Sequence, residues 1–414
     1  MTEQAKVPAI RFAGFTDPWE QRKLGEFGSV AMCKRIYKEQ TSEQGDVPFF
    51  KIGTFGADPD AFISNELFED YKRTYPYPTP GTLLISAAGS IGRIVEYQGE
   101  KAYFQDSNIV WLEHDHRLND AFLKPLYSKI EWGLEGSTIK RLYNKDLLSA
   151  EVTIPDGREQ KEIGQFFAKL DSLITLHQRK YDKLVIFKKS MLEKMFPKDG
   201  ESVPEIRFAG FTDPWEQRKF GDCFEFLKSN TLSRAGLNGE NGTARNVHYG
   251  DILIKFGDCL DGERSDLPFI TDDTVLPKFA GSILREGDVI FADTAEDEAA
   301  GKCVELRKLP KEPTISGLHT IPARPRFFFG TGYLGHYLNS DAYHRQLLPL
   351  MQGIKVISVS KAALQDTQVR FPGLSEQAAI GAALSEIDNL ITLHQRKLEL
   401  LQNIKKSLLD KMFV

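Results

Sequence analysis

Several residues in the first part of the chain have the types and spacing of phosphate contacts. The loop Ser86–Gly92 reads SAAGSIG and ends at Arg93. A glycine-rich backbone can approach a phosphate closely, and arginine or lysine can neutralise phosphates or read guanine edges. Further basic residues follow the predicted turn at 136–138, which reads GST. The pattern marks these candidate contacts to nucleic acid: Ser90, Arg93, Lys140, Arg141 and Lys145.

The later part of the chain holds a second set of candidates. Lys355 follows Gly353, at the same spacing from a repeated segment as the first set. Arg324 and Arg326 lie in a proline-rich loop beside Phe327–Phe329. A solvated surface charge is the alternative interpretation for each of these basic residues.

The sequence lacks the motifs of the enzymes that act on nucleic acids. Gly301-Lys302 is followed by Cys303 and lacks the earlier glycine of a phosphate-binding loop. No Asn/Asp-Pro-Pro-aromatic segment occurs that could hold an extruded adenine. Asp156, Glu159 and Lys161 resemble nuclease residues but lie too close in sequence to converge on a metal, and Asp156 suits a helix N-cap. We expect no catalytic residue.

Histidines and cysteines do not have the spacing of a metal site. His114 and His116 could form a pair, but no cysteine is near, so surface histidines are favoured. The four cysteines are far apart and are expected to be buried thiols rather than ligands or disulfides: Cys33, Cys223, Cys259 and Cys303. We expect no bound metal.

Two internal repeats organise the chain. Residues 7–25 and 203–221 differ at only two of 19 positions, and we call them the opening motifs. A second repeat aligns Glu159–Pro197 with Glu376–Val414 and keeps 21 of 39 residues. The chain is therefore two tandem halves, each with an opening motif, a divergent stretch and a closing segment. The divergence indicates one scaffold with two recognition surfaces; simple drift of a duplicated domain is the alternative.

The closing segments have the pattern of long helices. Apolar residues recur at alternating steps of four and three, and His177 and His394 occupy matching positions as polar register pins or partner contacts. Lys188 and Lys405 interrupt this seam. The apolar seam positions are Ile163, Phe167, Leu170, Ile174, Tyr181, Leu184, Met191 and Met195 in the first helix and Ile380, Leu384, Ile387, Ile391, Leu398, Leu401, Leu408 and Met412 in the second.

Each closing helix needs a partner to bury its seam. A helix of about 37 residues is roughly 55 Å long. We expect the two to pair antiparallel as a coiled coil with pseudo-twofold symmetry. Further apolar residues outside the seam, such as Phe166 and Phe187, indicate additional partner helices in a bundle.

The divergent stretches Glu26–Arg158 and Asp222–Ser375 are each long enough to fold alone. Short apolar runs predict strands and longer periodic runs predict helices, which together indicate compact α+β domains. The predicted strands are 82–86, 93–97, 108–112, 151–154, 251–255, 288–292, 302–307 and 367–371, and the predicted helices are 119–132 and 332–350.

Composition sets limits on partners and location. With 41% hydrophobic and 27% charged residues, the chain can form ordinary cores. No run is apolar enough for a membrane span and no signal segment is evident, so we expect a soluble, cytoplasmic protein. The net charge of −5 argues against nucleic acid as a partner, although a locally basic face on an acidic protein can still bind a duplex.

The doubled motif IRFAGFTDPWEQRK, each copy followed by a divergent region and a helix with EQ, IG, LITLHQRK and KMF, resembles the specificity subunits of type I restriction-modification systems. The resemblance covers nearly the whole chain. It implies two target-recognition domains at 1–158 and 199–375, and conserved helices at 159–198 and 376–414. A protein-binding adaptor with a coiled-coil scaffold is the alternative function.

The same resemblance implies partners and roles. Each recognition domain reads one half of an asymmetric DNA site, and the helix pair fixes the gap. Two modification subunits supply adenine-N6 methylation from S-adenosylmethionine, and restriction subunits supply ATP- and Mg-dependent cleavage, so this chain itself needs no cofactor. The repeated helical block is either a solvated face or the docking surface for the modification subunit: His177, Gln178, Arg179, His394, Gln395 and Arg396.

Overall fold

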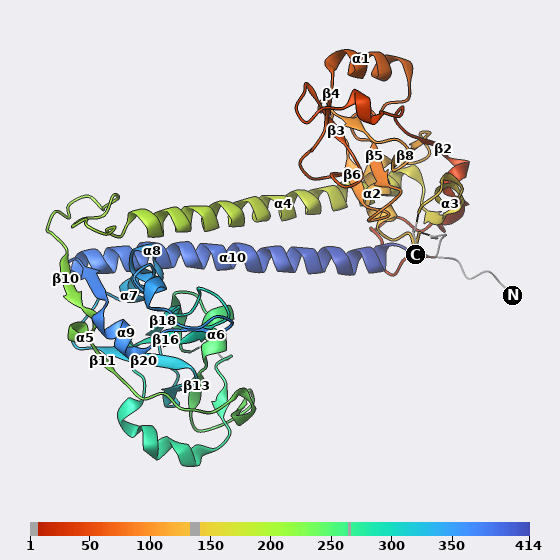
Figure 1. Ribbon diagram of the computed structural model, residues 1–414. Helices are drawn as coiled ribbons and strands as arrows, with labels where there is room; N and C mark the ends of the chain where they lie inside the picture. Colours follow the sequence, from red (N-terminus) through yellow and green to blue (C-terminus); the bar gives the residue numbers. More distant parts are fainter. Residues whose placement is uncertain (1–6, 133–140, 264–265) are drawn as a thin grey trace. The chain divides into compact units, whose positions relative to one another are not determined.

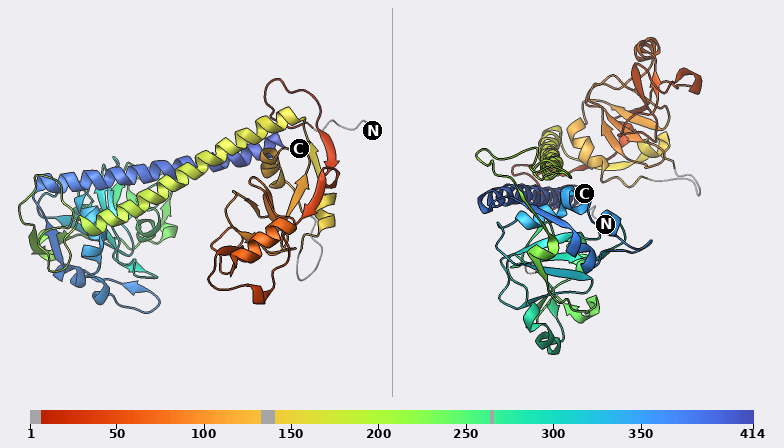
Figure 2. Two further views of the ribbon diagram at one scale, coloured as in Figure 1. Left: turned by 90° about the horizontal axis from the view of Figure 1, so that it is seen from above. Right: turned by 60° about the vertical axis from the view of Figure 1, so that its left-hand side comes forward.

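Two long helices run through a chain that divides into two units. The computed structural model describes residues 7–132, 141–263 and 266–414. Unit 1 extends to His177 and takes in Lys397–Val414, and unit 2 is Gln178–Arg396. Both long helices, α4 (Gly157–Lys194) and α10 (Leu374–Met412), are continuous in every view (Figure 1, Figure 2). The predicted α+β class is confirmed.

Unit 1 is built on an antiparallel sheet whose inner strands are buried on both faces. Successive residues of β8 point to opposite sides, so that Val110 and Leu112 enter one core and Ile109 and Trp111 the other. This main sheet has the order β2 (Gly28–Ala31), β8 (Ile109–His114), β5 (Leu83–Ser86) and β6 (Ile94–Glu96). A second sheet has the order β4 (Phe62–Ile63), β3 (Val47–Phe50) and β7 (Tyr103–Phe104), and the helices are α1 (Asn65–Thr74), α2 (Asp120–Tyr127) and α3 (Asn144–Ser149), with short 3-10 turns η1 (Leu24–Glu26) and η2 (Lys38–Gln40).

Unit 2 repeats this plan with additions. In β16, Val289 and Phe291 enter one core while Ile290 and Ala292 enter the other. Its main sheet has the order β11 (Phe224–Phe226), β20 (Thr320–Pro325), β16 (Val289–Ala292), β18 (Cys303–Arg307) and β14 (Cys259–Asp261). The second sheet has the order β12 (Leu237–Asn238), β15 (Phe269–Ile270), β13 (Arg245–Val247) and β19 (Thr314–Ser316), and a separate pair is formed by β17 (Thr294–Ala295) and β21 (Ile357–Ser358). The helices are α5 (Phe220–Cys223), α6 (Tyr249–Ile254), α7 (Tyr333–Asn339), α8 (Asp341–His344) and α9 (Lys361–Asp366). The 3-10 segments are η3 (Arg234–Gly236), η4 (Asp273–Ser282) and η5 (Leu348–Leu350).

The opening motif of each half joins the recognition domain to both long helices. Its EQRK end forms β1 (Glu20–Lys23), which pairs with β9 (Glu151–Ile154); β10 (Glu216–Lys219) pairs with β22 (Gln368–Phe371) in the same way. Upstream, Arg11 forms a bidentate ion pair with Glu159 in the first turns of α4, at 2.6 and 2.9 Å. The N–H of Ile10 donates to the carbonyl of Lys411 near the end of α10, at 3.0 Å.

Unit 2 repeats both contacts. Arg207 pairs with Glu376 at 2.7 Å through two nitrogens, and Ile206 donates to the carbonyl of Lys194 at 2.9 Å. The carboxylates are almost fully buried, with Glu159 1% and Glu376 2% exposed. Two neighbouring residues of the motif therefore hold the start of one helix and the end of the other, which explains why this segment is repeated while the middle is not.

The residues after each buried glutamate also pack against the recognition domain. The amides of Gln160 and Gln377 bond loop backbone in their own units. A Cβ at Gly164 would lie 2.7 Å from backbone atoms of Ala121, and one at Gly381 would lie 2.3 Å from the carbonyl of Thr331. The repeated EQ and IG pairs thus set how closely the helix approaches α2 or the start of α7.

The two long helices pair antiparallel, as predicted. In unit 1 the start of α4 meets the end of α10, since Phe167 and Phe413 have ring centroids 5.9 Å apart. In unit 2 the end of α4 carries Phe196 into the core beside Tyr337, with centroids 5.3 Å apart. The predicted seam is also confirmed, because its residues are buried or half-buried along both helices.

The lysines that interrupt the seam form equivalent ion pairs between the helices. Lys188 Nζ lies 2.5 Å from Asp388 in unit 2, and Lys405 Nζ lies 2.5 Å from Asp171 in unit 1. A parallel pairing of the repeats in register would instead place lysine against lysine and aspartate against aspartate. The charges therefore favour the antiparallel arrangement.

Two predicted elements are wrong. The run 251–255 is not a strand but most of helix α6, whose Asp251 side chain bonds Arg234 rather than following a sheet. The predicted helix 332–350 breaks at Ser340, where an extended backbone separates α7 from α8 and the hydroxyl bonds the Tyr337 carbonyl. Three of the four cysteines are buried and Cys259 is half-buried, and all four are free.

A lysine substitution tests the two ion pairs. Lys188 also contacts Asp258 at 2.6 Å, so Lys188→Met leaves two mostly buried carboxylates without their cation. We expect the free energy of unfolding to fall by about 3–5 kcal/mol. Lys405→Met is the matched control, because Lys405 is 31% exposed, against 17% for Lys188, and among the described residues it pairs with one carboxylate, Asp171; we expect a loss of less than about 1 kcal/mol. Urea unfolding of the full chain measures both, and equal losses would contradict this account.

Candidate nucleic-acid interface

The first set of predicted contacts gathers at one end of the main sheet in unit 1. The loop Ser86–Gly92 connects β5 to β6 and is closed by Ser86, whose hydroxyl accepts from the N–H of Arg93 at 2.9 Å and donates to the carbonyl of Ser90. Leu142 N–H donates to the Ala87 carbonyl at 2.9 Å and so ties the chain beyond 141 to this loop. We call this end of the sheet the loop end.

Two arginines lie around this loop and are held by backbone carbonyls. Arg93 donates to Gly56 at 3.1 Å, and Arg141 donates to Ser107 at 3.0 Å. Arg93 and Ser90 are exposed, and Arg141 is half-buried. The structure thus brings together two arginines that are 48 positions apart in sequence. A guanidinium anchored through one N–H keeps further donors that can face a phosphate or a base edge.

The remaining candidates of unit 1 are not part of this cluster. Lys145 is exposed on α3, which packs against η1 and β2. Lys140 lies outside the described residues.

Unit 2 has an equivalent loop end. The connection from β16 to β18 follows Ala292, and Val359 N–H donates to the Asp293 carbonyl at 2.8 Å, as Leu142 does to Ala87 in unit 1. Lys355 is exposed in the tight turn before β21, where Gly353 has φ +117° and Gln352 and Ser358 bond each other's backbone.

Arg324 and Arg326 lie at the other end of the same sheet. In the register of β16 and β20, Val289 faces Ala323 and Ala292 faces Thr320, so Arg324 is near the start of β16 while Lys355 is beyond its end. We call this the pocket end. The predicted contacts in unit 2 therefore form two separate groups.

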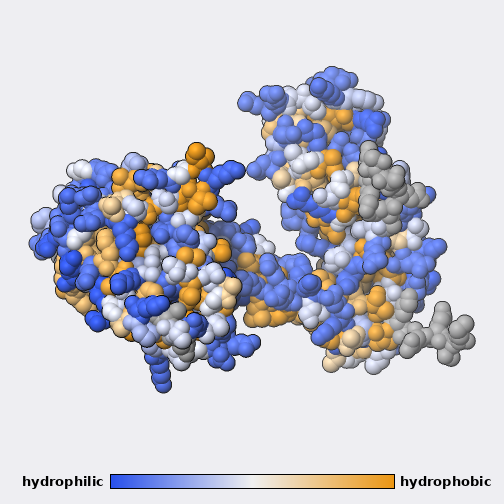
Figure 3. All heavy atoms as spheres, turned by 60° about the horizontal axis from the view of Figure 1, so that its bottom comes forward, coloured by the Kyte–Doolittle hydropathy of each residue, from blue (hydrophilic) through white to orange (hydrophobic). Residues whose placement is uncertain are grey.

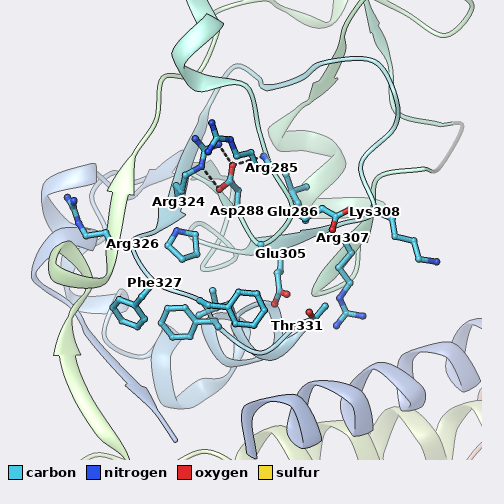
Figure 4. Close-up of a pocket in the computed structure, with 16 residues that line it drawn as sticks. Arg285, Glu286, Asp288, Glu305, Arg307, Lys308, Arg324, Arg326, Phe327 and Thr331 are labelled. Atoms are coloured by element: carbon cyan, nitrogen blue, oxygen red, sulfur yellow. Dashed lines mark hydrogen bonds and ion pairs between the residues drawn. The ribbon is translucent and has the colours of Figure 1, made fainter. Parts of the chain in front are cut away.

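The pocket end of unit 2 holds a cavity of about 630 Å³ with a basic rim. Arg324 binds Asp288 through two nitrogens at 2.9 and 2.7 Å and is only 19% exposed, so its charge is neutralised (Figure 4). Figure 4 also shows Arg326 on the far side of Arg324 from the centre of the pocket, and Arg307 extending toward α10. The other charged lining residues are Arg285, Glu286, Glu305 and Lys308.

The floor of this pocket is acidic. Glu305 accepts from the backbone N–H groups of Gly332 at 2.5 Å and Gly335 at 2.8 Å. Burial raises the pKa of Glu305 despite these bonds. Arg307 donates to Ser385 at 2.8 Å, while its Nε is buried without a hydrogen-bond partner among the described residues. The basic rim can hold an anion, but the acidic floor opposes its deeper entry.

The pocket end of unit 1 has a different character. Its cavity is about 190 Å³ and is lined by residues that include Tyr77, Trp111, Glu113 and Asp120. His114, once a candidate metal ligand, instead bonds Asp120 at 2.8 Å, which raises the pKa of the imidazole. The pocket ends differ in charge between the units, whereas the loop ends share their backbone contacts.

Sequence reasoning missed a polar cluster at the loop end of unit 2. Arg234 is held by Asp251 through two bonds of 2.8 and 2.9 Å and keeps 52% of its side chain exposed. Tyr249 stacks edge-on against His319, with centroids 5.3 Å apart. Reading 251–255 as a strand concealed α6, which carries Tyr249 and Asp251. The sequence could have indicated α6 only through His248, which caps the start of the helix by accepting from the N–H of Gly250.

One buried cluster has the composition of a metal site. Asp258, His336 and Asp388 offer ligand atoms within 4.8 Å of one another. The Lys188 ammonium, however, lies 2.6 and 2.5 Å from the two carboxylates. Burial opposes the charge, but the carboxylates outweigh it and raise the pKa of Lys188. The cluster thus already holds a cation, and it serves to join α4, α10 and the recognition domain.

The predicted partner contacts lie in the middle stretches of the long helices. His177, Gln178 and His394 are half-buried, and the other three are exposed: Arg179, Gln395 and Arg396. Gln178 bonds Asp182 on its own helix at 2.9 Å. Exposed leucines flank these residues, with Leu176 46% and Leu393 44% exposed. Elsewhere, hydrophilic residues cover much of the face in Figure 3 and hydrophobic ones occur in small groups.

Among the described residues, every helix is too short or too polar to cross a membrane.

The chain is similar to known specificity subunits. Residues 16–185 match the family described as type I restriction modification DNA specificity domain. A putative type I restriction enzyme specificity subunit of Haemophilus influenzae is 52% identical over 153 residues, which span 36% of this chain and 40% of that protein. The MjaVIII specificity subunit of Methanocaldococcus jannaschii is 23% identical over 345 residues, covering 79% of this chain and 77% of the relative.

The fold has a known counterpart in a solved structure. The type I restriction-modification S subunit from M. genitalium has a TM-score of 0.57 and 15% identity over 99% of both chains. At this identity the likeness concerns the fold. The chain is therefore similar to type I restriction-modification specificity subunits in sequence over residues 16–185 and in fold over nearly its whole length.

Proposed function

We propose that this chain is the non-catalytic subunit that gives a type I restriction-modification complex its DNA sequence specificity. Each recognition domain reads one half of a bipartite, asymmetric site. The paired helices set the number of base pairs between the halves.

The observation that carries this proposal is a shared framework with different loops. Leu142 and Val359 make the same backbone bond to the loop after β5 and after β16, respectively. The residues around that bond differ: arginines and serine in unit 1, and histidine, tyrosine and lysine in unit 2. Different side chains on one framework are what two different half-sites require.

The helix pair supports the role in spacing. α4 and α10 have 38 and 39 residues, which at 1.5 Å per residue is about 57 Å for each. Half-sites one helical turn apart lie about 34 Å from each other. A buried seam and two ion pairs hold the two helices in register. The helices therefore resist sliding along each other, which would make the distance between the half-sites variable.

The loop ends provide cationic contacts despite the net charge of −5. Charges interact over about 8 Å at physiological salt, so a phosphate at the loop end is attracted by Arg93 and Arg141 and is little affected by distant acidic residues. We assign base and phosphate contacts to the loop ends. Arg324 and Arg326 contact the duplex only if it also reaches the pocket end.

The chemistry belongs to other subunits in this proposal. Modification subunits bind S-adenosylmethionine, restriction subunits bind ATP and Mg, and two modification subunits dock on the repeated block around His177 and His394. The exposed leucines beside that block support a helical partner.

Selection from a random pool of duplex DNA tests the function. The purified complex of this chain with its modification subunits should enrich two short sequences at a constant gap. Enrichment of no sequence would contradict the proposal and favour a protein-binding adaptor.

The helix pair can be lengthened without touching the loops. We would insert seven residues between Leu173 and Ile174 and seven between Gln402 and Asn403. The ion pairs show that these two sites lie opposite each other on the paired helices. The double insertion therefore keeps both ion pairs and leaves both ITLHQRK blocks intact. Each insertion adds about 10.5 Å, so we expect the gap to grow by about 3 base pairs at about 3.4 Å each, with both half-sites unchanged.

Insertion in α4 alone is the control, since it shifts every seam contact beyond it and should impair assembly. Selection that returned altered half-site letters with the original gap would contradict the spacing role.

The loop-end arginines should contribute to DNA affinity through phosphate contacts. Arg93→Gln combined with Arg141→Gln should reduce affinity about tenfold and lower the slope of log K against log salt by about 2. Titration of the complex at several salt concentrations measures this. Arg326→Gln, measured alongside, should leave the slope unchanged. If only Arg326→Gln reduced the DNA affinity, the DNA would bind at the pocket end and not at the loop end.

A further inference from the structure

Strained backbone occurs at the loop end of both recognition domains. Among the described residues, the non-glycine residues with positive φ are Ser107 (52°), His319 (53°) and Lys308 (41°). This conformation is unfavourable for L-residues with a side chain and persists where the surroundings enforce it. Two of the three lie in matching turns of the two halves.

The matching turns lead into the second strand of each main sheet, β8 in unit 1 and β20 in unit 2. In unit 1 the turn joins β7 to β8, and in unit 2 it joins β19 to β20. β7 runs parallel to β3 as β19 does to β13. The turns share no sequence, since QDSN precedes Ile109 and GLH precedes Thr320. Their shared feature is thus the backbone and not the residues.

Both turns are bonded to the neighbouring loop in the same way. Ala87 N–H donates to the Asn108 carbonyl at 2.8 Å, and Asp293 N–H donates to the His319 carbonyl at 3.1 Å. In unit 1 the Ser107 carbonyl also accepts from Arg141. The strained residues therefore lie inside the proposed DNA contact surface of each unit.

The surroundings of His319 hold its imidazole in one orientation. Nδ1 lies 3.4 Å from Asp293 Oδ1, and the ring packs edge-on against Tyr249. The side chain is 48% exposed, so the opposite edge of the ring can reach a ligand. His248 lies beside His319. Its pKa is lowered by burial and by the nearby Arg234 and His319, so the three side chains form one cluster.

We propose that the strained turn before β8 and before β20 is a specificity-determining element in each recognition domain, with His319 reading a base of one half-site and Ser107 a base of the other. This rests on the proposed function. An imidazole or a hydroxyl can donate to or accept from the edges of bases.

The variants separate the side chain from the backbone. Asparagine and glycine tolerate positive φ, so His319→Asn and Ser107→Asn keep the turn and remove the reading group. His319→Gly is a second variant that cannot strain the turn. Lys308→Gly is the matched control, because it relieves the same kind of backbone at the pocket end, where Lys308 is 68% exposed.

Selection from a random duplex pool by the complex with its modification subunits provides the test. We expect His319→Asn and His319→Gly to reduce preference for the original base at one or two positions of one half-site by about tenfold. Ser107→Asn should affect only the other half-site, and Lys308→Gly neither. The gap should stay constant throughout.

Two results would overturn parts of this scheme. If the wild-type complex selects a bipartite sequence and both His319 variants and Ser107→Asn select that same sequence with equal preference, the turns do not determine specificity. If the wild-type complex selects no sequence, the proposed function fails, and the role of the turns with it.

Discussion

The buried arginine–glutamate pair at the start of each long helix is the interaction on which the architecture depends. A carboxylate that is almost fully buried is tolerable only with a hydrogen-bonded cation, and Arg11 and Arg207 supply it through two nitrogens each. The preceding isoleucines bond the end of the other helix. One short segment thus fixes where both helices meet the recognition domain, in each unit independently. Because a change of Arg11 or Arg207 would leave Glu159 or Glu376 without its cation, these positions cannot vary as the recognition surfaces do.

That constraint separates a fixed framework from variable loops. The main sheets bury alternate residues in two cores, so most inward positions of their strands carry apolar side chains that fit the packing. The loop ends face no such limit and carry different side chains in the two units. Charge at the pocket ends also differs, with a basic rim in unit 2 and acidic residues in unit 1. The two units thus share a frame and differ in the side chains that their sheet ends carry.

The sequence predicted the regular elements with strong periodicity and missed those that depend on distant contacts. The strands around Leu83–Ser86 and Val289–Ala292 and the helical seam follow from apolar patterns that burial imposes directly. The run at 251–255 contains three consecutive apolar residues, as a buried strand does, yet it belongs to α6, where Asp251 binds Arg234, 17 residues earlier. Similarly, the break at Ser340 depends on its own hydroxyl bond and on the packing of Tyr343 in the core. The basic candidates were predicted from neighbouring glycines and loops, whereas the grouping of Arg93 with Arg141 and the separation of Arg324 from Lys355 required the folded chain.

By itself, the sequence determined the duplication, the long helices, their seam and the expectation that they pair antiparallel, because repeats and periodicity are recorded in residue order. The pairing of Lys188 with Asp388 and of Lys405 with Asp171, and the cluster of Arg234, Tyr249 and His319, were decided only by the tertiary structure. These contacts join residues far apart along the chain, and their energies depend on distance and burial. Local sequence contains neither quantity, so only the folded chain shows which charged groups meet and which turns are strained.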